Sequence, residues 1–321
     1  MMMKTAKRLV GSVCFLLILA LLVHGLTFIT RNKTDSELVY PYYDEPKNSL
    51  DVVFVGSSHM MTAIYPLELY REYGIAAYDY ASSGLALPQL YYQVVEALKT
   101  QTPEVLVLDI SGVRYDNAKI TSPEYAHFQL DNMKWSLNRM EAIHDLIEDP
   151  GDRLEYYFPL LKFHTRWKEL TPEDFKRIAG DTKGARVIDM RWNTAPYEII
   201  PTDYVAPIPE CPEMYLRKIL DYCRGRGVQV LLFNPPDSAD ETLQGRYNAV
   251  YAIAEEYGLP YLNLMYHLDD LDFDYSTDMM DVQHCNQSGA EKVTSYEGAY
   301  LKENYDLPDR RDGAAYGRGA G

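Results

Sequence analysis

The feature that most constrains the fold is a repeated alternation of short apolar runs with helical stretches. Each run is rich in apolar and branched residues and has the length of one strand: residues 51–55, 76–80, 105–110, 228–233 and 260–264. Stretches of helical composition separate or follow them, at about 65–70, 88–99, 212–225, 240–257 and 287–303. Strands that alternate with helices at this spacing form βαβ units. The sequence therefore predicts an α/β fold with a five-stranded parallel sheet.

The alternation is interrupted between the third and fourth strands. Residues 112–209 contain helical stretches at about 131–148 and 152–168, followed by a proline-rich segment. A gap this long indicates an insertion, and insertions in α/β folds commonly shape access to the substrate. We therefore predict one domain over residues 50–308, with the insertion at about 112–209. The Gly-, Ala- and Arg-rich tail at 309–321 is predicted to be disordered.

The N-terminus contains an almost unbroken apolar run from Leu9 to Ile29. About 20 such residues span a bilayer, which predicts a transmembrane anchor at 9–30 and a linker at 31–49 that packs onto the domain. A cleaved signal would have a shorter core and a small-residue cleavage site; a buried core helix is the other alternative. Three basic residues precede the run and should stay cytoplasmic, which places the domain outside the cell membrane: Lys4, Lys7 and Arg8. Arg31 and Lys33 at the other end weaken this orientation.

Composition excludes several classes of function. The formal net charge of −16 over 321 residues argues against a nucleic-acid partner, because phosphates would be repelled. No His/Cys cluster has zinc-ligand spacing, and no Gly-x-Gly-x-x-Gly follows the first strand. We therefore predict neither a metal nor a cofactor.

Two short motifs carry the candidate chemistry. Gly56-Ser57-Ser58 directly follows the first strand, where the glycine allows a tight turn that presents a hydroxyl over the carboxyl edge of the sheet. Asp281 and His284 are three residues apart, just before the last helix. This spacing lets the carboxylate accept a hydrogen bond from one imidazole nitrogen while the other faces the same edge as a base. His59 is interpreted as a packing or substrate-contact residue.

On these two motifs the chain resembles the SGNH (GDSL-type) hydrolase superfamily. Its first block matches Gly56-Ser57-Ser58, with Ser57 in place of the usual Asp, and its last block matches Asp281 to Ala290. The resemblance covers roughly residues 50–110 and 215–303. With the anchor, it is closest to the D-alanyl-lipoteichoic-acid and alginate O-acetylation branches. It implies the SGNH hydrolase fold, a flavodoxin-like three-layer sandwich.

The resemblance also implies a role for each matching residue. Ser58, two positions after the glycine, would be the nucleophile, and Ser57 a turn residue. His284 would be the general base and Asp281 the acid that orients it. The backbone N–H groups of Ser58 and Gly84 would form the oxyanion hole.

One family position is not matched. The third block should supply an Asn after the third strand, but this chain has Asp109-Ile110-Ser111 there. Either another side chain supplies the donor, from the insertion or from Ser111 or Arg114, or activity is reduced.

The insertion contains an aromatic and basic cluster at residues 156–167. One interpretation makes it a wall of the substrate cleft, with His164, Arg166 and Trp167 as substrate-binding residues. The other makes it an amphipathic helix that lies on the domain.

The sequence thus predicts a membrane-anchored extracytoplasmic serine esterase or O-acyltransferase. Its substrate would be an acylated cell-envelope polysaccharide or teichoic-acid-like polymer, and a membrane-bound acyltransferase could be a partner. The alternative is a catalytically weak or inactive envelope protein of the same fold that binds glycan or scaffolds such an acyltransferase.

Overall fold

The protein is built around one parallel sheet, seen in a computed structural model that describes residues 2–191, 195–311 and 316. The five strands lie in the order β2-β1-β3-β4-β5. Their bounds are β1 (Val52–Val55), β2 (Ala77–Asp79), β3 (Val105–Asp109), β4 (Gln229–Asn234) and β5 (Tyr261–Asn263). This order is that of doubly wound, flavodoxin-like sheets. The predicted α/β class is confirmed.

Helices cover both faces of the sheet. On β1, Val53 and Val55 pack into a cluster with α5 (Leu87–Ala97), α10 (Glu210–Gly225) and α11 (Glu241–Tyr257). The alternate residues Val52 and Phe54 pack into a second cluster with α3 (Ser58–Ala63), α4 (Pro66–Tyr73) and α13 (Gln287–Asn304). Alternate side chains of a strand point to opposite faces, so the molecule has three layers.

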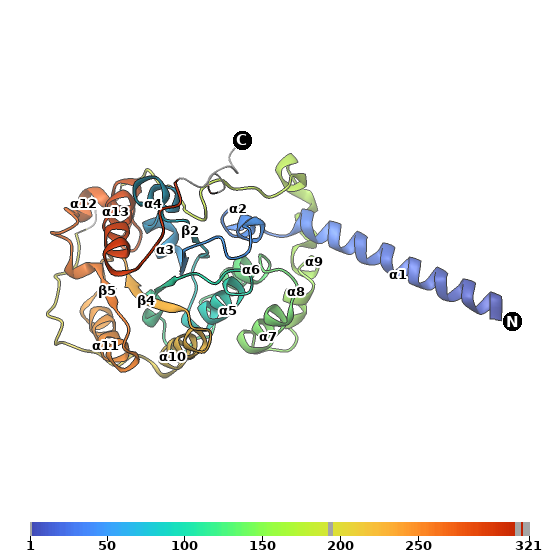
Figure 1. The fold of residues 1–321 in the computed structure, drawn as a ribbon. Coiled ribbons are helices and arrows are strands. Elements are labelled where there is room, and N and C mark those ends of the chain that lie inside the picture. The colour runs from blue at the N-terminus through green and yellow to red at the C-terminus, as the bar shows by residue number, and fades with distance from the viewer. Residues whose placement is uncertain (1, 192–194, 312–315, 317–321) are drawn as a thin grey trace.

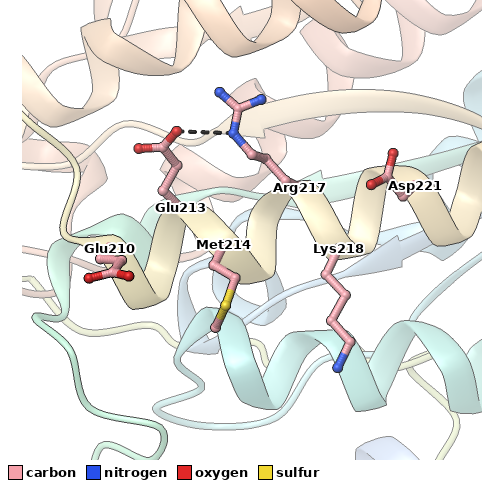
Figure 2. A pocket seen from close by; sticks show the side chains of 6 residues that line it. All are labelled: Glu210, Glu213, Met214, Arg217, Lys218 and Asp221. Atoms are coloured by element: carbon pink, nitrogen blue, oxygen red, sulfur yellow. Dashed lines mark hydrogen bonds and ion pairs between the residues drawn. The ribbon is translucent and has the colours of Figure 1, made fainter.

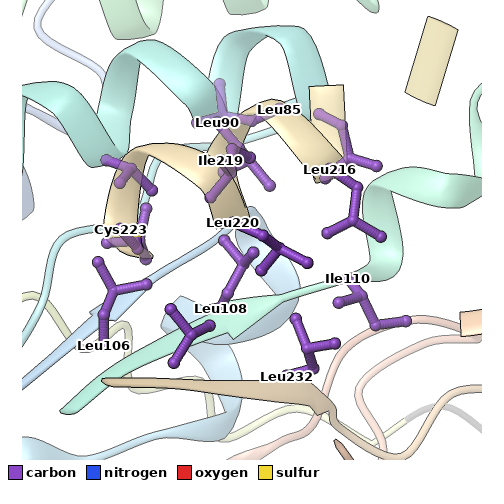
Figure 3. Close-up of a cluster of buried hydrophobic side chains, with 14 of the residues drawn as sticks. Leu85, Leu90, Leu106, Leu108, Ile110, Leu216, Ile219, Leu220, Cys223 and Leu232 are labelled. Atoms are coloured by element: carbon purple, nitrogen blue, oxygen red, sulfur yellow. The ribbon is translucent and has the colours of Figure 1, made fainter. Parts of the chain in front are cut away.

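Figure 3 shows part of the first cluster, in which Leu216, Ile219 and Leu220 of α10 lie over Leu106 and Leu108 of β3. Full burial of one such side chain stabilises the fold by about 2 kcal/mol. This packing holds β3 in place in the sheet, and with it the residues that follow the end of the strand.

The chain between β3 and β4 forms several short helices instead of the two long ones predicted from the sequence. In chain order these are η2 (Ser111–Arg114), α6 (Pro123–Leu130), α7 (Leu137–Leu146), α8 (Arg153–Tyr157), α9 (Leu160–Phe163), η3 (His164–Lys168) and η4 (Pro172–Phe175). The side chain of Ser136 caps α7 by accepting from the Arg139 N–H, so this helix starts later than predicted. Pro159, which has no N–H to donate, separates α8 from α9.

The N-terminal helix α1 (Met2–Thr30) projects away from the domain (Figure 1). Its segment Lys7–Thr30 is long and apolar enough to cross a membrane. The chain then enters α2 (Ser36–Val39) and η1 (Tyr40–Asp44), and the fully buried ring of Tyr42 stacks on Tyr80 with centroids 4.3 Å apart. The segment that follows α1 is thus packed onto the domain.

The last part of the chain connects β5 to α13 and then returns to the start of β1. η5 (Leu264–Tyr266) and α12 (Tyr275–Asp278) connect β5 to α13. Of the predicted disordered tail at 309–321, residues 309–311 and 316 are described, and Arg310 forms an ion pair of 2.7 Å with Asp51. The other tail residues lie outside the described part of the chain.

Candidate active site

A tight turn at the end of β1 carries the two adjacent serines. A Cβ on Gly56 would lie 2.6 Å from Cβ of Met60 and 2.7 Å from Cβ of Asp109, so only glycine allows the chain to turn this closely. Ser57 caps the following helix, where its Oγ accepts from the His59 N–H at 3.3 Å. Ser58 is the first residue of α3.

The two serines have different environments. The Ser57 N–H and hydroxyl both donate to Asp109 Oδ2, at 3.0 and 2.8 Å, and the residue is buried. Ser58 is only partly buried, and its Oγ lies 2.8 Å from His284 Nε2. Ser57 thus stabilises the turn, while Ser58 presents its hydroxyl to a base.

His284 and Asp281 form a short hydrogen-bonded pair before α13. His284 Nδ1 lies 2.8 Å from Asp281 Oδ2, and the backbone N–H of His284 also donates to Asp281, at 3.0 Å to Oδ1. The loop is closed by a hydrogen bond of 2.8 Å from the Met280 N–H to the His284 carbonyl. The structure therefore brings Ser58, His284 and Asp281 into one chain of hydrogen bonds.

The protonation of this chain follows from its contacts. Burial acts to raise the pKa of Asp281, but hydrogen bonds from His284 and from the Gln283 N–H outweigh it and lower the pKa below the usual aspartate value. An ionised carboxylate can only accept, so His284 Nδ1 carries the proton and donates it to Asp281. In the neutral imidazole this leaves Nε2, 2.8 Å from Ser58 Oγ, as the nitrogen that can accept from the Ser58 hydroxyl, which is the arrangement a general base requires.

The two predicted oxyanion-hole donors are unpaired in the described part of the chain. Among the described residues, the N–H groups of Ser58 and Gly84 donate to no other group. Gly84 has φ 64°, and a Cβ there would lie 2.5 Å from the ring of Tyr125, so the ring covers this glycine. Tyr125 belongs to α6, and Thr121 donates to the Gly84 carbonyl. The first part of the insertion therefore packs against the predicted oxyanion loop.

Asp35, just beyond the end of α1, holds the other side of this loop. Its Oδ2 accepts from the Ser82 hydroxyl at 3.0 Å and from the Ser83 N–H at 2.7 Å. Arg186 pairs with the same carboxylate. The loop that carries Gly84 thus depends on a residue of the segment that follows α1.

The missing Asn is not replaced by Ser111 or Arg114 in the contacts seen here. Arg114 is paired with Asp237 and donates to the Tyr247 hydroxyl at 2.9 Å. The N–H of Ser111 donates to Asp109 Oδ1 at 2.7 Å, and its Oγ lies 3.3 Å from Ser57 Oγ. Both residues stabilise the strand ends.

Two residues next to the triad support the site. The sequence motifs did not reveal the role of Asp109, whereas His59 is interpreted from the sequence as a packing or substrate-contact residue. Asp109 accepts from the Ser57 hydroxyl in the turn after β1, a contact between residues 52 apart in sequence. His59 is buried with its ring centroid 5.3 Å from that of His284. Burial, together with the nearby Arg114 and His284, lowers the pKa of His59 well below its usual value, so it stays neutral. The sequence could have indicated this role of Asp109 only through its position at the end of the third strand, on the same sheet edge as Ser57.

His164, Arg166 and Trp167, predicted to bind substrate, lie in another part of the molecule. They belong to η3, which contacts α1. In Figure 1 the adjoining α9 lies beside α1, far from α3 and α13 at the other side of the domain. Arg166 Nη1 donates to the Thr30 carbonyl at 2.9 Å. The structure does not bring these three residues to Ser58.

Two features of the structure bear on ligand binding. The described residues contain no group of three His, Cys, Asp or Glu side chains arranged to hold a metal ion. A hollow of about 550 Å³ lies along α10 (Figure 2), where Glu213 pairs with Arg217 at 3.0 Å. Lys218, also at this hollow, lies 4.0 Å from the ring centroid of Tyr91. None of the triad residues lines it.

Comparisons with known proteins give distant structural similarity only. No family model and no curated protein matches the chain. The chain is similar to a lipolytic protein described as of the G-D-S-L family from Desulfitobacterium hafniense, at 11% identity and a TM-score of 0.41, over 78% of this chain and 98% of that one. It is also similar to a catalytic mutant of an acetylxylan esterase from Geobacillus stearothermophilus, at 12% identity and a TM-score of 0.39, over 81% and 96% of the two chains. The functional inference below rests on the contacts of the site, because similarity at this level does not transfer function.

Proposed function

We propose that the protein is a serine esterase or O-acyltransferase that uses Ser58, His284 and Asp281. The observation that carries this proposal is the continuous hydrogen-bond chain from Ser58 Oγ to His284 Nε2, at 2.8 Å, and from Nδ1 to Asp281, also at 2.8 Å. Nucleophile, base and orienting carboxylate within hydrogen-bond reach are the signature of an activated serine.

The proposed reaction has two halves. Ser58 Oγ attacks the acyl carbonyl while its proton moves to His284 Nε2, and Asp281 stabilises the imidazolium. The oxyanion is held by the N–H groups of Ser58 and Gly84, each worth about 3 kcal/mol in comparable sites. His284 then returns the proton to the leaving alcohol, which leaves an acyl-Ser58 ester. Water or a glycan hydroxyl attacks that ester, again with His284 as base.

We further propose that α1 anchors the protein in the cell membrane, with the domain outside. The 24 residues Lys7–Thr30 extend about 36 Å as a helix, enough for a hydrocarbon core of about 30 Å. At its far end, Arg31 is bonded to the Asp131 carbonyl and Lys33 to the Asp174 carbonyl. Both cations therefore belong to the folded domain, which supports Lys7 and Arg8 as the cytoplasmic flank. An anchored domain favours an acylated cell-envelope polysaccharide or teichoic-acid-like polymer as substrate.

A serine-reactive fluorophosphonate tests the nucleophile on the full-length protein in detergent. We expect the wild type and Ser57→Ala to be labelled and Ser58→Ala to remain unlabelled. Ser57→Ala is the matched control, because it alters the same turn without removing the reactive hydroxyl. Equal labelling of the wild type and Ser58→Ala would refute the assignment.

A second candidate function is a catalytically weak or inactive envelope protein that binds glycan or scaffolds a membrane-bound acyltransferase. It is favoured by the contacts of Arg114 with Asp237 and of the Ser111 N–H with Asp109, because they engage the two nearby candidates for the place of the expected oxyanion-hole Asn. An unlabelled wild type that still binds an acylated envelope glycan would favour this candidate.

A further inference from the structure

The segment from residue 158 to residue 177 packs around the end of α1. α9, η3 and η4 all contact α1, and Figure 1 shows α9 beside the end of that helix. Arg166 donates to the carbonyls of Thr30 and Arg31, and its Nη2 lies 3.1 Å from Asp174 Oδ1. These inward contacts fix the segment at the point where α1 meets the domain.

Several large apolar side chains of this segment are exposed. Four large side chains, each more than half exposed, lie on it: Phe158 (54%), Leu161 (54%), Trp167 (65%) and Phe175 (61%). The segment also has exposed cations, of which we consider Lys168 and Arg177. Lys168 Nζ lies 5.7 Å from the Trp167 ring centroid, and Arg177 pairs with Asp44 at 2.8 Å. We call these six residues the interfacial patch.

We infer that the interfacial patch lies in the headgroup layer of the membrane that α1 spans, and that its cations bind the phosphates of anionic lipids. The inference rests on the membrane span proposed above and is independent of the catalytic proposal. Aromatic side chains concentrate at the level of the lipid headgroups, where the ring is half in the apolar layer and half in water. The patch has this composition and directly adjoins the end of the apolar helix.

Charge supports a lipid surface as the occupant. Residues 158–177 contain five basic and three acidic residues, whereas the whole chain carries a formal charge of −16. Lys162 and Arg177 pair with Glu155 and Asp44 outside this range, so this part of the surface is close to neutral on a strongly acidic protein. It therefore does not repel an anionic surface, to which each nearby cation contributes about 1 kcal/mol. Apolar side chains exposed together mark a surface that is covered in the functional state.

A crevice continues the patch toward α1. It has a volume of about 240 Å³ and includes Phe28 of α1, Tyr40, Lys134 and Arg177 in its lining. Lys134 Nζ lies 4.4 Å from the ring centroid of Tyr43, another lining residue. Asp44, paired with Arg177, also lines it. Aromatic walls with two cations suit a phosphate headgroup whose acyl chains run along α1.

Depth-dependent quenching tests the inference on the full-length protein in nanodiscs. The chain has three tryptophans, so W135F/W192F leaves Trp167 as the single fluorophore. Lipids brominated at a shallow or a deep acyl position then report its depth. We expect blue-shifted emission and stronger quenching by the shallow bromines. The control is M214W in the background W135F/W167F/W192F, because Met214 is 51% exposed on α10, away from α1.

The outcomes separate the inferences. Trp167 fluorescence that is quenched no more than that of the Met214 control overturns the patch, even when the protein copurifies with nanodiscs. Failure to copurify overturns the membrane span and the patch with it, while fluorophosphonate labelling still reports on Ser58. Replacement of anionic lipid by phosphatidylcholine should reduce Trp167 quenching about twofold. Unchanged quenching would overturn the role assigned to the cations.

Discussion

The two polar clusters of this protein, one at the sheet edge and one at the end of α1, are built in opposite ways. At the sheet edge, side chains bond to side chains: Ser58 to His284 at 2.8 Å and His284 to Asp281 at 2.8 Å. At the end of α1, side chains bond mainly to backbone carbonyls, as Arg166 does to Thr30 and Arg31. Chemistry at the first cluster depends on each side chain. The second cluster needs only a donor of the right length, so substitutions there should affect stability and spare catalysis.

The largest expected loss of turnover is that of His284→Gln, and the neighbouring His59 provides the contrast. His284→Gln should lower turnover of a small acetyl ester by about 10⁴-fold, because it removes the base that takes the Ser58 proton. His59→Gln should keep turnover within about tenfold, because His59 is neutral and contacts no triad atom by hydrogen bond among the described residues. Equal losses in the two variants would show that the proton path includes His59.

Asp281→Asn should lower turnover by about 10³-fold and leave folding intact. The amide is neutral and can donate as well as accept, so it no longer requires the proton to sit on His284 Nδ1 and no longer stabilises the imidazolium by charge. Steady-state kinetics with the same ester measures this, with circular dichroism as the folding check. A variant with wild-type kcat would mean that the carboxylate does not orient the base.

Glu297 contrasts with both clusters, whose side chains are hydrogen-bonded, because it is a buried carboxyl that has no partner among the described residues. Burial raises the pKa of Glu297 to about 8, from 4.5 in an unstructured chain. Between these values the folded state binds a proton that the unfolded state has released, so stability falls as pH rises. The loss is about 2.5 kcal/mol between pH 5 and pH 7.

Glu297→Gln should remove this slope. Thermal unfolding midpoints in detergent at pH 5 and pH 8 should differ by less in the variant than in the wild type. Burial also raises the pKa of Asp79 and of Asp237, so these carboxyls retain part of the pH dependence. Identical pH dependence in both proteins would show that Glu297 is ionised or solvated in the fold.

The smallest effect is expected at the end of α1. Arg166→Ala should destabilise the protein by about 1 kcal/mol, because the carbonyls of Thr30 and Arg31 lose a donor. Turnover of a small ester should be unchanged. Arg224→Ala, an exposed residue paired with Asp221, is the control and should change neither property. A large loss of turnover in Arg166→Ala would restore Arg166 as a substrate-binding residue.

The sequence predicted what local patterns determine. Strand runs and their spacing predicted the sheet, and the positions of Ser58 and Asp281-x-x-His284 at strand and helix ends predicted that these residues share one edge. The contacts that could not be predicted join distant segments. Asp109 supports Ser57 because β1 and β3 are neighbours in register. Arg166 contacts α1 because of how the insertion folds, which its aromatic and basic composition does not reveal.

The insertion also shows where composition misleads. Residues 152–168 have the content of one amphipathic helix, but Pro159 divides them, and the pieces turn different side chains outward. The aromatic and basic character that suggested a glycan-binding wall is equally suited to a lipid surface. Only the contacts with α1 separate the two interpretations.

The contacts of Asp35 determine where the chain could be cut between α1 and the domain. The residue lies five positions after the end of α1, and its carboxylate accepts from Ser82 and Ser83 in the loop that carries Gly84. A soluble fragment that starts at residue 36 would keep the whole sheet and the Ser58–His284–Asp281 chain, yet lose the acceptor that shapes this loop. Cleavage before residue 31 would retain Asp35. The residues that shape the loop of Gly84 therefore begin directly after α1, not at the first strand.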